Sequence, residues 1–168
     1  MEGQIILMRD AQDYREGDGV AVSERDCGMA VDFLRETSSV EGGTLAAFPS
    51  GAPIIHSSLE RARLAAERIG SAFEAPLFES ERLRNISLSN NIHTYPVDFA
   101  GFLATELGLA GRQAWREAGS LLVVAHEPLV AAANGRHRAP HCYPFVFDND
   151  QYRAMISLAI ERRSLSVN

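Results

Sequence analysis

Residues 4–10 read Gln-Ile-Ile-Leu-Met-Arg-Asp, an apolar run that ends in an arginine and an aspartate. A continuous run of this kind, with β-branched residues, is typical of a parallel strand that is buried on both faces. The carboxyl ends of such strands commonly open onto a ligand site. We therefore expect Arg9 and Asp10 to lie at the edge of a site.

Two further segments repeat this pattern of an apolar run that ends at a polar residue. Residues 54–56 precede Ser57, and residues 121–125 precede His126. Parallel strands bring their carboxyl ends to the same edge of a sheet. The polar residues that follow all three runs are therefore expected at one edge of one sheet.

Helical patterns follow the first two of these strands. Ser23 is a suitable N-cap for a helix over residues 24–36, which carries apolar side chains at helical spacing. Ser57 or Ser58 could cap an amphipathic helix over residues 59–72. This alternation of strand and helix is typical of an α/β fold.

Weaker signals fill the rest of the chain. Pro96 suits the first turn of a helix over residues 97–107, and Gly108 suits its end. The remaining expected elements are a loop over 13–20, a strand over 76–78, a short helix over 113–118, and an antiparallel pair of strands over 143–147 and 152–160 joined by a turn at 148–150.

These elements together predict a single domain over residues 1–168. The length and the 46% hydrophobic content suit one core with a sheet covered on both faces. We expect a three-layer α/β/α sandwich with a mostly parallel central sheet.

The charge and composition exclude several classes of partner. The net charge of −6 is not clustered, so neither nucleic acid nor an anionic membrane is an expected partner. All 16 basic residues are arginine, which removes lysine chemistry from consideration.

The start MEGQIILMRD resembles neither a signal peptide nor a membrane span, and Cys27 and Cys142 form no metal motif. We expect a cytoplasmic protein with two reduced thiols. The sequence leaves the oligomeric state open between a monomer and a homodimer.

Three ordered motifs resemble those of one enzyme family. Residues 9–11 read Arg-Asp-Ala, residues 57–63 read Ser-Ser-Leu-Glu-Arg-Ala-Arg, and residues 123–128 read Val-Val-Ala-His-Glu-Pro. The histidine phosphatase (phosphoglycerate mutase-like) superfamily has R-H-G or R-H-A, then S-S-P-L-x-R-A, then V-x-G-H-x-P, at comparable spacing. Residues 23–25 also resemble the start of a helix motif of that family. The resemblance implies the phosphoglycerate mutase-like form of the α/β fold.

The resemblance also implies roles for the residues of these motifs. In the family a neutral histidine attacks the phosphoryl group, while two arginines and a second histidine hold the phosphate oxygens. Carried over, Arg9 and Arg61 would bind the anion, with Ser57 beside them, and His126 would be the second histidine. The position of the nucleophile holds Asp10. Guanidinium groups would attract this carboxylate, so a dianionic phosphate should bind less well than in a family member.

A second departure concerns the general acid. Residues 81–86 resemble a family segment whose glutamate protonates the leaving group, and Asn85 stands at the place of that glutamate. An asparagine can orient a ligand but cannot transfer a proton. A laboratory substitution at position 10 alone would not explain both departures from the family motifs.

Metal binding is a further alternative at this site. Asp10, Asp13, His126, His137 and His141 could supply a carboxylate and imidazoles to a transition metal. The segment 137–141 fits an ordinary loop better, and the D-x-D pattern of aspartyl-phosphate enzymes is absent. We therefore expect neither a metal nor a cofactor, and Asp10 is not expected to be a nucleophile. His56 and His93 are expected to have structural roles.

Three functional hypotheses remain open. The first is a repurposed protein that binds or transforms a small anionic metabolite, a carboxylate or a phosphate. Asp10, as an acid/base or cation-binding group, and His126 would be its catalytic residues, and the binding residues would be Arg9, Arg61, Asn85 and Ser57. The second is a catalytically inactive pseudophosphatase that binds a ligand or a protein. The third is a residual phosphatase or phosphotransferase that acts on a phosphorylated small molecule.

Overall fold

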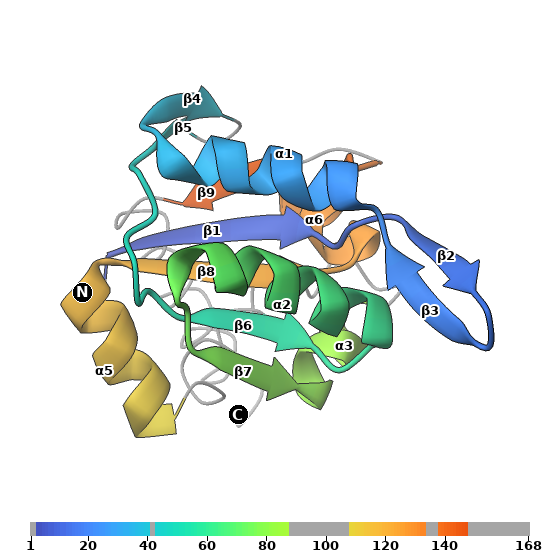
Figure 1. Ribbon diagram of the computed structural model, residues 1–168. Helices are drawn as coiled ribbons and strands as arrows, with labels where there is room; N and C mark the ends of the chain where they lie inside the picture. The colour runs from blue at the N-terminus through green and yellow to red at the C-terminus, as the bar shows by residue number, and fades with distance from the viewer. Residues whose placement is uncertain (1–2, 41–42, 88–107, 134–137, 148–168) are drawn as a thin grey trace, which may run out of the picture.

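The structure, a computed structural model, describes residues 3–40, 43–87, 108–133 and 138–147 (Figure 1). Five strands form a central sheet in the order β7-β6-β8-β1-β9. Neighbouring strands are parallel except for β9, which runs antiparallel to β1. These strands are β1 (Gln4–Arg9), β6 (Ile54–Ser57), β7 (Leu77–Ser80), β8 (Ser120–Ala125) and β9 (Pro144–Phe147). The prediction of a mostly parallel central sheet is confirmed.

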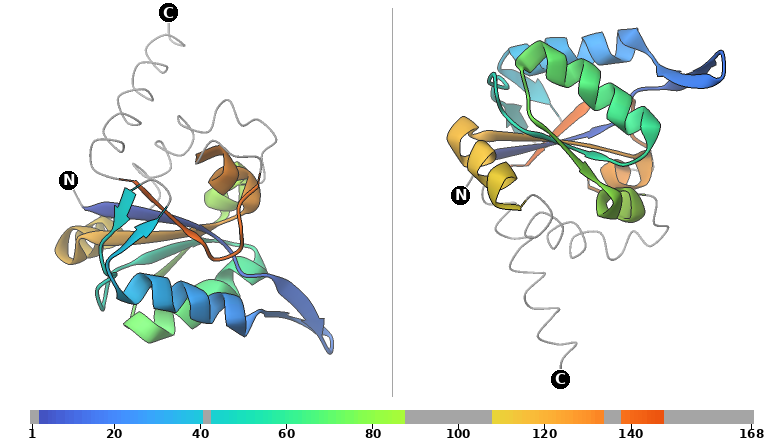
Figure 2. Two further views of the ribbon diagram at one scale, coloured as in Figure 1. Left: turned by 90° about the horizontal axis from the view of Figure 1, so that it is seen from above. Right: turned by 60° about the horizontal axis from the view of Figure 1, so that its bottom comes forward.

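Both faces of the sheet are buried. Along β1, Ile5 and Leu7 join one hydrophobic cluster, whereas Ile6 and Met8 join another on the opposite face. Such alternation is the side-chain period of a strand. Figure 2 shows α1 and α2 over one face, and α3, α5 and α6 over the other. The helices are α1 (Glu24–Arg35), α2 (Glu60–Phe73), α3 (Glu81–Ser87), α5 (Gly108–Ala118) and α6 (Glu127–Ala133). The predicted three-layer α/β/α sandwich is confirmed.

The two predicted N-caps have different outcomes. Ser23 caps α1, because its side chain accepts a hydrogen bond from the backbone N–H of Asp26 at 3.1 Å. The N-cap of α2 is Leu59, without a side-chain cap bond, so the prediction of Ser57 or Ser58 was wrong. The physical reason is that Ser57 is the last residue of β6, where its side chain is committed to the site described below.

Two small hairpins lie outside the central sheet. The predicted loop over 13–20 is in fact the hairpin of β2 (Asp13–Glu16) and β3 (Gly19–Val22), which projects from the body in Figure 1. All four residues of β2 are exposed, so this strand has no apolar face that periodicity could detect. A second hairpin joins β4 (Ser38–Val40) to β5 (Gly43–Leu45).

The remaining predictions fall partly outside the described residues. The helix expected over 113–118 begins at Gly108, so this glycine opens α5 with a φ of +65°. The helix expected over 97–107, the turn at 148–150 and the strand expected over 152–160 lie outside the described residues. Within the described part of the chain, each helix is too short or too polar to cross a lipid bilayer.

Candidate functional site

The strand order sets the order of the polar residues at the carboxyl edge of the sheet. Strand β8 lies between β6 and β1 and is parallel to both. His126, which follows β8, therefore lies between Ser57 at the end of β6 and Asp10 after β1. The backbone N–H of Asp10 also donates to the carbonyl oxygen of Ala125 at 2.9 Å, which fixes the ends of β1 and β8 against each other.

A chain of hydrogen bonds links these three side chains. His126 Nδ1 lies 2.9 Å from Asp10 Oδ2, and His126 Nε2 lies 2.7 Å from Ser57 Oγ. An ionised carboxylate can only accept, so Nδ1 carries the hydrogen in the neutral ring. Nε2 then accepts the hydrogen of the Ser57 hydroxyl. The exposed fractions are 2% for Asp10, 1% for His126 and 0% for Ser57, so water does not compete with these bonds.

Arg61 completes this arrangement from α2. Its Nε donates to the same oxygen of Asp10, Oδ2, at 2.8 Å. A buried carboxylate is costly unless it is paired and hydrogen-bonded, and two donors on Oδ2 meet this requirement. The Arg61 side chain is 36% exposed. It is therefore the member of the group that faces solvent.

Arg9 does not join this group. Its Nη1 donates to the carbonyl oxygen of Ala139 at 2.8 Å and lies 3.3 Å from Glu127 Oε2. Among the described residues Arg9 forms no hydrogen bond or ion pair with Asp10 or Arg61. The expectation that both arginines attract Asp10 therefore holds for Arg61 and fails for Arg9. The reason is the alternation of β1, which directs successive side chains to opposite faces.

The other candidate residues have different surroundings. Asn85 is exposed on α3 and has no hydrogen bond to Asp10 or His126 among the described residues. His56 is buried, with Nδ1 2.9 Å from the carbonyl oxygen of Ser57, which suits a structural role. His141 Nδ1 lies 2.7 Å from the backbone oxygen of Asp10. This histidine therefore holds the backbone at the tip of β1.

No cluster of possible ligands within the described ranges supports the hypothesis of a metal site. They contain no group of three or more His, Cys, Asp or Glu side chains that could hold a metal ion. Asp13 lies on the exposed strand β2. His93 and His137 lie outside the described residues.

Sequence reasoning missed two contacts of this site. It assigned Ser57 to anion binding but not to a hydrogen bond with His126, and it did not identify Glu127 as the partner of Arg9. Ser57 and His126 both follow predicted strands, which was the available signal for their contact. The sequence did not show which strands are adjacent in the sheet. A separate groove of about 670 Å³ between the β2–β3 hairpin and α2 shares no residue with this site.

No protein-family model matches the sequence, and no curated protein matches it. Solved structures do match. The protein assigned as the phosphohistidine phosphatase SixA of Agrobacterium tumefaciens is 14% identical, with a TM-score of 0.53 over 88% of this chain and 92% of that chain. The alpha-ribazole phosphatase of Shigella flexneri is 15% identical, with a TM-score of 0.49 over 89% of this chain and 92% of that chain. At 14% identity, the likeness to the Agrobacterium tumefaciens structure carries the fold and no activity. The chain therefore has a phosphoglycerate mutase-like α/β fold.

Proposed function

We propose that this chain has exchanged phosphohistidine chemistry for the binding or transformation of a small monoanionic metabolite. The observation that supports this proposal is the pair of hydrogen bonds on Asp10 Oδ2, from Arg61 Nε at 2.8 Å and His126 Nδ1 at 2.9 Å. Asp10 stands where the motif pattern of the fold family has its nucleophilic histidine. An oxygen that already accepts two hydrogen bonds is a poor nucleophile, and it occupies part of the anion site.

The charges of the site favour a monoanion over a dianion. Asp10 neutralises Arg61, and Glu127 neutralises Arg9, so the two arginines leave no net positive charge. A dianionic phosphate therefore gains little from the site and is repelled by Asp10. Within the described part of the chain, the two Nη groups of Arg61 have no hydrogen-bond partner. They can bind one carboxylate through two parallel hydrogen bonds.

The ligand hypothesis is tested by comparing anions of different charge. We expect the unmodified protein to bind acetate or benzoate more tightly than inorganic phosphate in isothermal titration, by at least about tenfold. Arg61→Ala should abolish this binding, whereas Arg63→Ala should not. Arg63 is a matched control because it lies on the same helix and pairs with Glu60 and Glu67. Phosphate binding that exceeds carboxylate binding would contradict the proposal.

The loss of phosphohistidine chemistry is tested by restoring it. We expect Asp10→His combined with Asn85→Glu to hydrolyse 4-nitrophenyl phosphate, and the unmodified chain to have little such activity. Asp10→Ala combined with Asn85→Glu is the control, because it removes the carboxylate without adding an imidazole. Steady phosphate release by the unmodified chain at ordinary enzyme rates, about 1–1,000 per second, would refute the proposed loss.

A further inference from the structure

The hydrogen bonds of the site form a carboxylate–imidazole–hydroxyl series. Asp10 Oδ2 binds His126 Nδ1, and His126 Nε2 binds Ser57 Oγ. This is the geometry in which an aspartate orients an imidazole and the imidazole removes the proton of a serine. Such triads are recognised by the geometry and the roles of the groups, because their order along the chain differs between folds.

We propose that Ser57 is a catalytic nucleophile and that the chain hydrolyses small carboxylic esters. This inference rests on the proposed function, since it names the reaction and the substrate class of the same site. A serine hydroxyl alone is a weak nucleophile, and an adjacent base activates it. Here His126 is that base, and Asp10 stabilises the imidazolium that forms when the proton is transferred.

The local structure around Ser57 suits a nucleophile. Ser57 ends β6, and α2 begins three residues later at Glu60. The backbone N–H of Leu59 donates to Ser57 Oγ at 3.3 Å, so the oxygen has one donor on it while its own hydrogen faces His126. The N-terminus of the 14-residue helix α2 adds partial positive charge near the hydroxyl.

Two groups can stabilise the oxyanion that would form at the carbonyl oxygen. Ser58 Oγ is buried and has no hydrogen-bond partner among the described residues, an uncommon state for a buried hydroxyl that a substrate oxygen would relieve. The Nη groups of Arg61, which have no hydrogen-bond partner within the described ranges, are the second source of donors. Arg61 is partly exposed and Ser57 is buried, so the proposed reaction requires the substrate to enter past the Arg61 side chain. The depth of the hydroxyl restricts the class to small acyl groups.

The reaction follows from these positions. Ser57 Oγ bonds to the carbonyl carbon while its proton passes to His126 Nε2, which leaves a tetrahedral oxyanion. The bond from carbon to the leaving oxygen then breaks, and His126 returns the proton to that oxygen, so an alcohol departs and an acyl-serine remains. A water molecule attacks the acyl carbon while His126 takes its proton. The bond between the acyl carbon and Ser57 Oγ then breaks, the carboxylic acid leaves, and the proton on His126 restores the Ser57 hydroxyl.

The charges of the site favour an ester over a phosphoester. A neutral ester brings no charge toward Asp10, and a single negative charge develops in the transition state, opposite Arg61. A phosphomonoester would bring two charges in the ground state. An ester with a carboxylate group of its own could bind Arg61 through that group. The carboxylate released by its hydrolysis would belong to the class of monoanion that we propose the site binds.

The test uses the full chain and an active-site-directed probe. We expect a fluorophosphonate to add to Ser57, detected by mass spectrometry of the peptide, and hydrolysis of phenyl acetate or acetylsalicylate to release acid. Ser57→Ala should abolish both. Asp10→Asn should slow labelling by about 100-fold or more, because the imidazole loses its charged partner. Ser120→Ala is the matched control, since Ser120 is a buried serine at the opposite end of the sheet. It should label and hydrolyse like the unmodified chain.

Two results would overturn the inference. One is a protein that fails to label at Ser57, and the other is a Ser57→Ala variant with unchanged ester hydrolysis. If Ser57→Ala does not fold, Ser57→Cys provides a second test. Its thiol would lie beside His126 Nε2, which can take the thiol proton, so it should alkylate with iodoacetamide faster than Cys27 or Cys142. Failure of labelling with intact, Arg61-dependent carboxylate binding would reject the esterase alone. Tighter phosphate than carboxylate binding would reject the proposed function.

Discussion

The repulsion of phosphate that we propose for Asp10 can be measured with an isosteric variant. Asp10→Asn removes the negative charge but keeps an oxygen that can accept from both Arg61 Nε and His126 Nδ1. The fold should survive, because no cavity is created and both donors keep an acceptor. The variant therefore isolates the electrostatic effect of the carboxylate on anion binding.

The size of the effect follows from Coulomb's law. A phosphate held by Arg61 would lie about 4 Å from the Asp10 carboxylate, where each unit of charge costs about 4 kcal/mol at an effective dielectric constant near 20. That cost corresponds to about three decades in affinity. Solvent and salt screen part of it, because the Arg61 side chain is 36% exposed. We therefore expect Asp10→Asn to bind phosphate about 10- to 100-fold more tightly than the unmodified chain.

Isothermal titration with inorganic phosphate at pH 8 and low ionic strength is the assay, since phosphate is mainly a dianion there. Glu67→Gln is the matched control, because it changes the net charge by the same amount at a residue that pairs with Arg63 on the surface. It should leave phosphate affinity unchanged. If Asp10→Asn binds phosphate no better than Glu67→Gln, then Asp10 does not oppose the anion and the charge argument fails.

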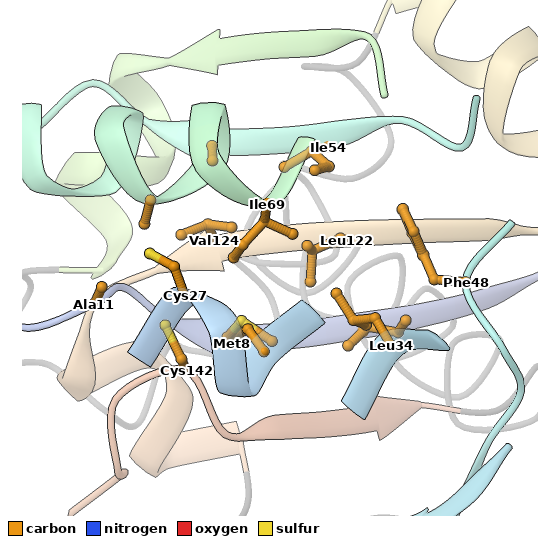
Figure 3. Close-up of a cluster of buried hydrophobic side chains, with 14 of the residues drawn as sticks. Met8, Ala11, Cys27, Leu34, Phe48, Ile54, Ile69, Leu122, Val124 and Cys142 are labelled. Carbon is orange, nitrogen blue, oxygen red and sulfur yellow. The ribbon is translucent and has the colours of Figure 1, made fainter. Parts of the chain in front are cut away.

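Three other expectations concern the fold. Leu34→Ala should lower the free energy of unfolding by about 2–5 kcal/mol in urea denaturation, because Leu34 is fully buried in the cluster under α1 (Figure 3); a loss under about 1 kcal/mol would contradict its core role. Ser23→Ala should cost about 1 kcal/mol in the same assay through loss of the helix cap, and no change would mean that the cap bond is not formed in solution. A hydrogen bond between the two buried thiols lowers the pKa of Cys27 and raises the pKa of Cys142, so as the pH rises Cys27 should be alkylated first in peptide mass spectrometry. Equal rates at both cysteines would contradict that pairing.

The parts of the fold that sequence reasoning identified are those with continuous burial. Strands β1 and β8 contain the continuous apolar runs 5–8 and 121–125 because helices cover both of their faces, and such runs can be detected from the sequence alone. The β2–β3 hairpin was missed because β2 is exposed along its whole length, so no hydrophobic pattern marks it. Its turn residues, Gly17 and Asp18, were the available signal.

The site was predictable to the level of strand ends and no further. Asp10, Ser57 and His126 each follow an apolar run, so their common edge could be inferred from a parallel sheet. Which of the three side chains lies between the other two depends on the order of the strands in the sheet, and that order could not be inferred from the sequence. The fate of Arg9 depended on a partner, Glu127, whose side chain had no motif to mark it.

Under the two proposals above, the residue at position 10, at the tip of β1, decides which neighbouring side chain attacks a substrate. With aspartate there, His126 Nδ1 has an acceptor and Nε2 is directed to the Ser57 hydroxyl. With a histidine there, as in the motif pattern of the fold family, His126 loses that acceptor and the new imidazole itself would face the phosphoryl group. The two chemistries should therefore exclude each other on this scaffold. Accordingly, a gain of phosphatase activity in Asp10→His combined with Asn85→Glu should coincide with the loss of reactivity at Ser57, since the first requires an imidazole at position 10 and the second requires the carboxylate that the imidazole replaces.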